Sequence, residues 1–232
     1  MKTQHIHAIL DRSGSMHGKI QDVIGGFKTN INDLKSSKKV GYNIAVSAKM
    51  FDQEEEVLIH TTDVHALSDE IIDKEMEKYI PKGQTAIRDA LGNSLVHFIE
   101  KYKKKEFESC IIYVFTDGLE NASKTFSVSQ IREMVCDAET HNIKVIYVGS
   151  NQDSILNAAD LGISPGLALD YDECAENINC VYRALSGVAE RVRNGIDADF
   201  TLPERLASRS VNTIKVNDSV EPPPIKRTET KA

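Results

Sequence analysis

Short apolar runs alternate along the chain with longer stretches in which apolar residues recur at helical spacing. The run Cys110–Phe115 is continuously apolar, as expected for a strand buried on both faces of a parallel sheet. Between Tyr42 and Met50 apolar and polar residues alternate, which is strand periodicity. From Ile20 to Leu34 the apolar residues form one helical stripe. The predicted strands are 5–10, 42–50, 57–61, 110–115, 144–148 and 167–171. The predicted helices are 20–34, 86–102, 128–138, 153–161 and 178–192.

This alternation of strands and helices predicts an α/β fold with helices on both faces of the sheet. Right-handed crossovers favour a doubly wound, Rossmann-like sheet of six strands, mostly parallel, in the order 3-2-1-4-5-6. A short turn, Phe51–Glu55, separates the second strand from the third, so we expect a hairpin that makes the third strand an antiparallel edge. In such sheets ligands bind beyond the carboxyl ends of the strands, where the strand order reverses. The loops after strands 1 and 4 are therefore the place to look for chemistry.

Composition and charge restrict the class of protein. With 41% hydrophobic and 27% charged residues, the chain of 232 residues resembles ordinary soluble globular proteins. It has no run of the ~18 apolar residues that span a bilayer, and its first residues lack the apolar run of a secretory signal. Four cysteines without CxxC spacing fit a reducing compartment, so we expect a cytoplasmic protein without membrane association. The net charge of −7 argues against nucleic-acid binding.

The charge is unevenly distributed and indicates a tail. From Thr201 onward six basic residues accompany four acidic ones, so this end carries +2 and residues 1–200 carry −9. The same end holds Pro222–Pro224 and few bulky apolar residues. Such a composition does not offset the entropy of ordering. We therefore expect one folded domain over residues 1–198 and a flexible, proline-containing tail over 199–232.

Five oxygen-bearing side chains are predicted to meet at the crevice between strands 1 and 4. Asp11, Ser13 and Ser15 follow the first strand, and Asp117 follows the fourth. Thr85 stands in a Gly-Gln-Thr turn before a predicted helix. Two carboxylates and three hydroxyls, with no thiolate or imidazole, suit Mg²⁺ (or Mn²⁺ or Ca²⁺) far better than Zn²⁺. Two carboxylates balance a divalent cation, which leaves the metal an open position for a carboxylate supplied by a partner.

These residues carry a resemblance to a known family. The pattern Asp11-x-Ser13-x-Ser15, with Thr85 in its Gly-x-Thr turn and Asp117 followed by glycine, resembles the metal-ion-dependent adhesion site of von Willebrand factor type A domains. The resemblance implies direct coordination by the three hydroxyls and coordination by the two aspartates either directly or through water. It also implies metal-dependent protein binding rather than catalysis.

The resemblance covers residues 4 to about 194 and implies the same doubly wound fold. The segment Tyr147–Asp153 is similar to small stand-alone members of the family found in bacteria and their viruses. We accordingly expect a monomeric module that binds an exposed Asp or Glu of a partner protein through the metal.

Loops around the crevice are expected to form a partner-binding rim. The predicted rim residues are Arg12, Gly14, Gln84, Gly118, Glu120, Asn121, Asn151 and Gln152. For those that follow the fourth and fifth strands, an alternative interpretation is ordinary loop and helix-cap chemistry.

An alternative function is a metal-dependent phosphatase or hydrolase that uses Asp11 as nucleophile. The commonest motif of that kind has a second aspartate two residues later, where this chain has Ser13. The only histidine that adjoins the five ligands is His17, so an evident general base is missing and we predict that the protein is not an enzyme. His5 and His7 share one strand face, and hydrogen-bonded sheet histidines are favoured over a metal pair.

Overall fold

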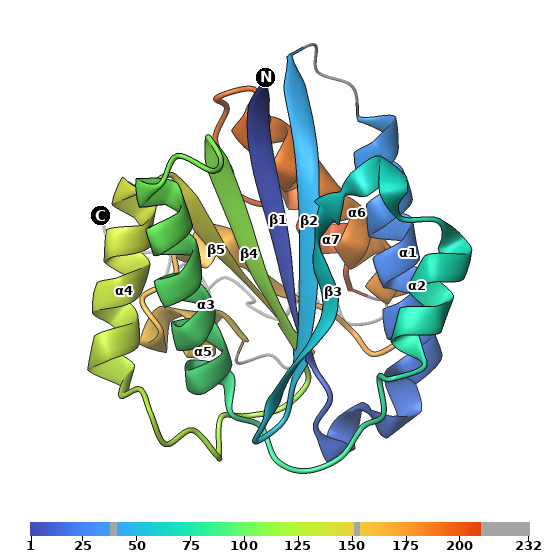
Figure 1. Cartoon of the computed structure of the whole chain (residues 1–232). Coiled ribbons are helices and arrows are strands. Elements are labelled where there is room, and N and C mark those ends of the chain that lie inside the picture. The colour runs from blue at the N-terminus through green and yellow to red at the C-terminus, as the bar shows by residue number, and fades with distance from the viewer. Residues whose placement is uncertain (38–40, 151–153, 210–232) are drawn as a thin grey trace, which may run out of the picture.

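The computed structural model describes residues 1–37, 41–150 and 154–209. Within these residues six strands form one sheet in the order β3-β2-β1-β4-β5-β6 (Figure 1). The strands are β1 (Lys2–Asp11), β2 (Tyr42–Phe51), β3 (Glu55–Asp63), β4 (Ser109–Thr116), β5 (Ile143–Gly149) and β6 (Ala168–Asp170). Neighbouring strands are parallel except β2 and β3, which pair antiparallel. The predicted strand order and antiparallel edge strand are confirmed.

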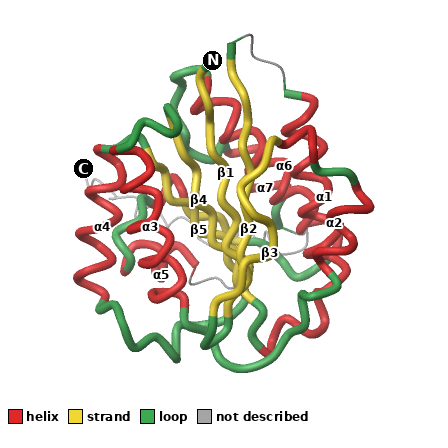
Figure 2. The backbone as a smooth tube through the Cα atoms, in the orientation of Figure 1, coloured by secondary structure: helices red, strands yellow, loops and turns green. Residues whose placement is uncertain are grey.

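Helices cover both faces of the sheet, as predicted. They are α1 (Ile20–Ser36), α2 (Asp69–Met76), α3 (Ile87–Lys103), α4 (Val128–Thr140), α5 (Ser154–Asp160), α6 (Ala175–Arg193) and α7 (Leu202–Ala207). Figures 1 and 2 show α3, α4 and α5 on one side of the sheet and α1, α2 and α6 on the other. Of the helices in the described ranges, none is both long and apolar enough to cross a membrane.

Helix α2 has no counterpart among the predicted elements. The Ser68 hydroxyl caps it by accepting a hydrogen bond from the Ile71 N–H at 3.3 Å. Of its eight residues only Ile72 and Met76, one turn apart, are buried. Three apolar residues, of which Ile71 and Ile72 are adjacent, do not define a helical period, which is why the apolar pattern did not predict this helix.

The strands that lead to the crevice lie at the centre of the core. All eight residues of β4 are buried, which accounts for the continuously apolar run Cys110–Phe115 within it. The Phe115 ring stacks on the rings of Tyr171 and Tyr182, with centroids 5.1 and 5.3 Å apart. Helices α1 and α6 approach closely at Gly26, where a Cβ would lie 2.2 Å from Tyr182 Cδ2. Only a residue without a side chain fits there.

The folded part extends beyond the predicted boundary at residue 198. The sequence predicts a flexible tail from residue 199, but Phe200 and Ser208 are buried and α7 begins with a capping box between Thr201 and Glu204. The Arg205 guanidinium donates hydrogen bonds to backbone carbonyls of the 165–168 turn. These contacts depend on a distant turn, so composition does not indicate them. Residues 210–232, the rest of the predicted tail, lie outside the described residues.

Candidate metal centre

The carboxyl ends of β1 and β4 meet where the strand order reverses, and each brings an aspartate to that point. Asp11 is the last residue of β1, and Asp117 directly follows β4. Ser13 and Ser15 lie in the loop and 3₁₀ turn (Gly14–Lys19) that lead into α1, and Thr85 lies just before α3. Four of these side chains belong to buried residues, while Ser15 is exposed at the mouth of the crevice.

Both carboxylate oxygens of Asp11 are held by hydrogen bonds. Oδ1 accepts from the Ser13 N–H at 2.6 Å, and Oδ2 accepts from the Thr116 hydroxyl at 2.5 Å. Burial nevertheless raises the pKa of Asp11 to about 6, and the neighbouring charge of Asp117 acts in the same direction. The charged form of Asp11 is therefore costly in the metal-free protein, and a cation beside it would stabilise that form.

A chain of hydroxyls joins the first loop to Asp117. The hydroxyl oxygens of Ser13 and Ser15 lie 3.1 Å apart, and the Ser15 hydroxyl donates to Asp117 Oδ1 at 2.5 Å. The loop after β1 and the loop after β4 therefore share one polar cluster, although more than 100 residues separate them.

Thr85 reaches the same cluster from the side of α3. A Cβ placed on Gly118 would lie 2.9 Å from Thr85 Oγ1 and 3.7 Å from Asp11 Oδ2. The side-chain oxygens of Thr85 and Asp11 therefore both lie next to Gly118. The Asn121 side chain accepts a hydrogen bond from the Thr85 N–H at 2.9 Å, and the Thr85 carbonyl accepts from the N–H groups of Asn121 and Ala122. The fold thus brings all five predicted ligands to one crevice, and metal binding by them stays a prediction.

This donor set fits a hard divalent cation. Carboxylate and hydroxyl oxygens are the ligands that Mg²⁺, Mn²⁺ and Ca²⁺ prefer. Among the described residues no group of three or more His, Cys, Asp or Glu side chains could hold a metal ion. A metal at this crevice would therefore rely on the serine and threonine oxygens in addition to the two carboxylates, and would keep positions for water or a partner.

The structure also places a lysine at the crevice that the sequence interpretation missed. Lys19 Nζ donates to Asp117 Oδ2 and, at 2.9 Å, to Glu173 Oε1. Only 12% of the Lys19 side chain is exposed. Its signal in the sequence is weak, because Glu173 lies 154 residues away and belongs to a segment with no predicted role. Lys19 supplies one positive charge to a carboxylate that a divalent metal would also use.

Arg12 was predicted to lie on the rim, and the structure corrects this. Its side chain is buried, with ion pairs to Asp52 at 3.2 Å and to Glu56 at 2.8 Å. The guanidinium turns away from solvent because these two acidic residues flank the β2–β3 turn beside it. The Arg12 side chain therefore ties the loop after β1 to Asp52 and Glu56 and does not present its charge to a partner.

Some of the other predicted rim residues are exposed, and others form hydrogen bonds within the loops or with the start of α3. Gln84 and Asn121 are exposed, and Gly14 donates its N–H to the Gly83 carbonyl at 3.2 Å. Glu120 is only partly exposed, and its carboxylate accepts hydrogen bonds from the N–H groups of Arg88, Ala122 and Ser123. These contacts support the loop and the first turn of α3, while a place for Glu120 on a partner-binding rim stays a prediction. Gly118 packs against Thr85, and Asn151 and Gln152 lie outside the described residues.

A doubly wound sheet with carboxylates and hydroxyls at its switch point defines an α/β domain with an oxygen-rich crevice beyond β1 and β4. No protein-family model and no curated protein matches the chain. Solved structures do match it, and they show that the chain has the fold of von Willebrand factor type A domains.

Three of these structures illustrate the likeness. The von Willebrand factor type A protein from Catenulispora acidiphila has a TM-score of 0.61 at 14% identity, over 82% of this chain and 43% of that chain. Manganese-loaded TRAP protein of Plasmodium vivax has a TM-score of 0.53 at 18% identity, over 74% and 69% of the two chains. Proximal thread matrix protein 1 of the mussel byssus, with a zinc-occupied adhesion-site motif, has a TM-score of 0.54 at 17% identity, over 82% and 45%. The chain thus spans less than half the length of the first and third of these proteins.

Proposed function

We propose that this chain is a divalent-metal-dependent protein-interaction module. The observation that carries the proposal is the meeting of Asp11, Ser13, Ser15, Thr85 and Asp117 at one crevice, as described above. A bound metal would supply an electrophilic position for an acidic side chain of a partner. Metal-loaded structures with the same fold, one with manganese and one with zinc, support a divalent ion at this place. Mg²⁺ is our first choice of metal, because the donor set consists of hard oxygens.

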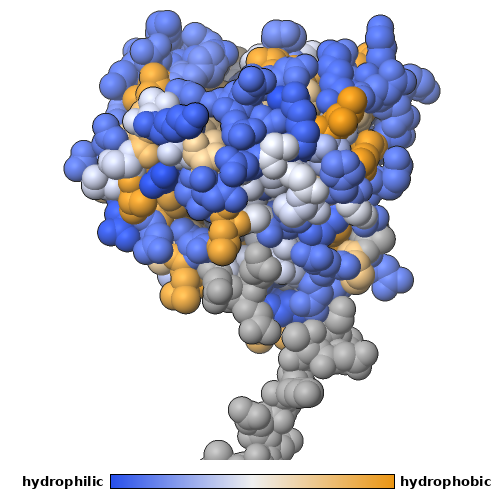
Figure 3. Space-filling view, turned by 90° about the horizontal axis from the view of Figure 1, so that it is seen from below, coloured by the Kyte–Doolittle hydropathy of each residue, from blue (hydrophilic) through white to orange (hydrophobic). Residues whose placement is uncertain are grey.

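The surface around the crevice is compatible with a protein partner. Figure 3 views the molecule from the end where the carboxyl ends of the strands lie, and this face is mostly hydrophilic with separate hydrophobic spots. Leu119, directly after Gly118, is 58% exposed and offers an apolar contact beside the metal. Interfaces commonly combine such an anchor with a polar rim. The partner is expected to be a protein with an exposed Asp or Glu, and not a nucleic acid, given the net charge of −7.

A phosphatase or hydrolase at the same crevice receives less support. The commonest motif of an aspartyl nucleophile has a second aspartate two residues later, where this chain has Ser13. The His17 ring is exposed, and its Nδ1 lies 3.1 Å from the Gly14 carbonyl, which leaves it poorly placed as a general base. We therefore propose a binding protein and not an enzyme.

Location and assembly are further parts of the proposal. All four cysteines are free thiols, in keeping with a reducing compartment, and we propose a cytoplasmic monomer.

Metal-induced stabilisation tests the metal site. We expect Mg²⁺ or Mn²⁺ to raise the melting temperature of the wild type, and Asp11→Ala or Asp117→Ala to abolish this rise while the circular dichroism spectrum stays native. Glu133→Ala, which changes an exposed carboxylate on α4, is the matched control and should respond like the wild type. Calorimetry that detects no Mg²⁺ or Mn²⁺ binding by the wild type at millimolar metal would refute the metal site.

Binding to an array of peptides tests the partner class. We expect capture of peptides with a central Asp or Glu in Mg²⁺, and loss of capture in EDTA or when those residues are Asn or Gln. Equal capture of acidic and amide peptides would contradict the proposed role of the partner's carboxylate, even if metal binding itself is intact.

A further inference from the structure

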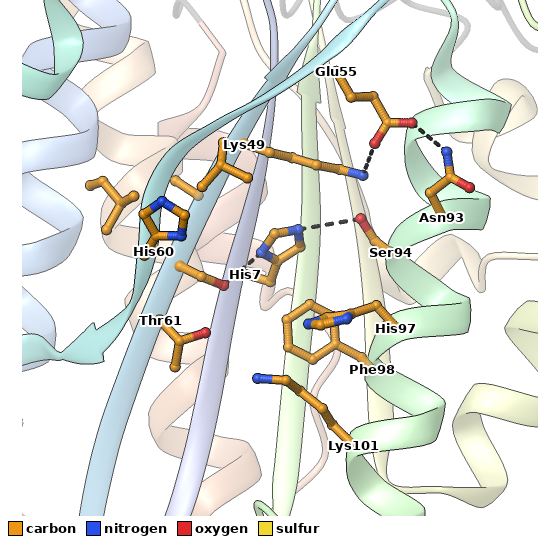
Figure 4. A pocket seen from close by; sticks show the side chains of 14 residues that line it. His7, Lys49, Glu55, His60, Thr61, Asn93, Ser94, His97, Phe98 and Lys101 are labelled. Carbon is orange, nitrogen blue, oxygen red and sulfur yellow. Dashed lines mark hydrogen bonds and ion pairs between the residues drawn. The ribbon is translucent and has the colours of Figure 1, made fainter.

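A second cavity, of about 550 Å³, opens on the side of the sheet that faces α3. Residues of β1, β2, β3 and α3 line it (Figure 4). His7, which lines the cavity, precedes Asp11 by four residues on β1, which corresponds to about 13 Å along a strand. Pockets for small molecules commonly have volumes of roughly 300–1,000 Å³. The cavity therefore has the size for a small organic molecule and is separate from the metal crevice.

Basic side chains outnumber acidic ones in this cavity. The basic lining residues are Lys49, Lys101, His7, His60 and His97, and among the described residues the only carboxylate in the lining is that of Glu55. Glu55 already has partners for both oxygens, because Oε2 accepts from Lys49 at 2.5 Å and Oε1 accepts from Asn93 at 2.6 Å. Two lysines against one carboxylate leave the lining with one net positive charge, which favours an anionic ligand.

Two lysines line the cavity, and Figure 4 shows their ammonium groups at opposite ends of it, on either side of His7. Lys49 Nζ uses two of its three N–H donors, on Glu55 and on the Ala90 carbonyl at 2.6 Å. Lys101 extends from α3 toward the strands (Figure 4), and its ion pair with Glu106, at 3.4 Å, is solvent-screened. Partial burial, followed by the charge of Lys101, lowers the pKa of His97.

His7 lies at the inner end of the cavity, and both of its ring nitrogens already have hydrogen-bond partners in the protein. Its Nδ1 lies 2.8 Å from the Ser47 hydroxyl, which His5 also contacts at 2.8 Å, and its Nε2 lies 3.3 Å from the Ser94 hydroxyl. The interpretation of these two residues as hydrogen-bonded sheet histidines is thus confirmed. Burial lowers the pKa of His7 well below its usual value, so its ring is neutral.

One wall of the cavity is apolar and defines the other half of the ligand. Val57, Ile59 and Phe98 line it, and Val57 is 50% exposed. Ile59 and Phe98 are already buried, so Val57 supplies the water-exposed apolar surface that a bare inorganic anion would leave uncovered and an apolar group would cover. The described residues here offer no cluster of three His, Cys, Asp or Glu side chains for a metal, so the histidines do not indicate a cation site.

We propose that this cavity binds a small organic anion, whose apolar body lies against Val57 and Ile59 and whose carboxylate or phosphate head accepts a hydrogen bond from Lys101. The site is distinct from the metal crevice and does not depend on the function proposed there.

Octanoate and octyl phosphate are suitable probes, because they share one apolar chain and differ in the anionic head. We expect isothermal calorimetry with the full chain to detect both, and the tighter of the two identifies the preferred head. Octanol should bind at least ~10-fold more weakly and octylammonium should not bind. In NMR spectra the ring signals of His60 and His97 should shift on titration with either anion. Equal binding of octanol, or no binding of either anion at millimolar concentration, overturns the proposal.

Variants locate the binding. Lys101→Met should weaken binding of both anions about 10-fold, which corresponds to about 1.4 kcal/mol. Lys103→Met removes the same charge from an exposed position on the same helix turn and should leave the affinity unchanged. Thr61→Trp should fill the cavity and abolish binding, while an aromatic residue remains compatible with a strand. An affinity of Lys101→Met equal to that of Lys103→Met contradicts the assignment of the head group.

Discussion

Replacement of Lys19 by methionine separates the charge at the metal crevice from the packing around it. Methionine keeps an apolar chain but removes the ammonium that donates to Asp117 and Glu173. Only 2% of the Asp117 side chain is exposed, so the pair is well shielded from water. An ammonium and a divalent metal would compete for the same carboxylate, so Lys19→Met should have opposite effects on the metal-free protein and on metal binding.

The magnitudes follow from the shielding of the pair. Removal of one partner of a fully buried pair costs roughly 3–5 kcal/mol, so for this pair we expect the metal-free protein to lose about 1–3 kcal/mol of unfolding free energy. Two charges 4 Å apart attract by about 4 kcal/mol at an effective dielectric constant of 20, and desolvation offsets most of this. A remainder of about 1.4 kcal/mol would make Mg²⁺ bind about tenfold more tightly to the variant. If Kd falls from on the order of 1 mM to 0.1 mM, 10 mM Mg²⁺ stabilises the variant by about 2.7 instead of 1.4 kcal/mol.

Urea unfolding followed by circular dichroism, in EDTA and in 10 mM MgCl₂, measures both effects, and calorimetry gives the affinity directly. Lys28→Met is the matched control, because it removes the same charge from α1, where Lys28 pairs with the exposed Asp73 at 2.5 Å. Equal Mg²⁺ affinities for the wild type and both variants would refute the competition between Lys19 and the metal.

Three further outcomes follow from packing and burial. Burial lowers the pKa of His5 to about 3, so between pH 7 and 5 only the unfolded chain takes up a proton at this residue. The unfolding free energy should therefore fall by up to about 2 kcal/mol over this pH range. An unfolding free energy that changes equally with pH in His5→Gln and in the wild type contradicts this. Gly26→Ala should cost about 1–3 kcal/mol against the tyrosine ring 2.2 Å from its methyl, whereas Gly25→Ala, with nothing within 4 Å, should gain about 0.5–1 kcal/mol in thermal unfolding. Gly118→Ala should weaken Mg²⁺ binding severalfold in calorimetry with the fold intact, because its methyl would lie 2.9 Å from Thr85 Oγ1.

The strand order and the meeting of the candidate ligands could be predicted because each depends on a local signal. The run Cys110–Phe115 is apolar at every position because both of its faces are buried, and this marks the centre of the sheet. Asp11 is the last residue of β1 and Asp117 directly follows β4. Both strands are central and parallel, so their carboxyl ends lie at the same edge of the sheet. Local sequence and topology were sufficient to place both carboxylates.

The remaining features depend on partners that are distant in the sequence. Glu173 meets Lys19 only once α6 has packed on α1, and no local pattern links the two residues. Arg12 stands in a polar loop, which suggests exposure, yet its partners are Asp52 in the β2–β3 turn and Glu56 in β3. The segment after Phe200 is short and poor in apolar residues, and it is held through side-chain contacts to backbone carbonyls that the apolar pattern does not reveal.

Arg12 has a consequence for the thermodynamics of metal binding. It stands between two candidate ligands, Asp11 and Ser13, and its backbone is fixed on both sides: its N–H donates to the Phe51 carbonyl at 2.8 Å, and its carbonyl accepts from the Lys82 N–H at 2.7 Å. The loop is thus ordered before any metal arrives, and little conformational entropy is left to lose on binding. Metal affinity at this crevice should then follow the charges around it, and metal exchange should proceed without local unfolding of the loop.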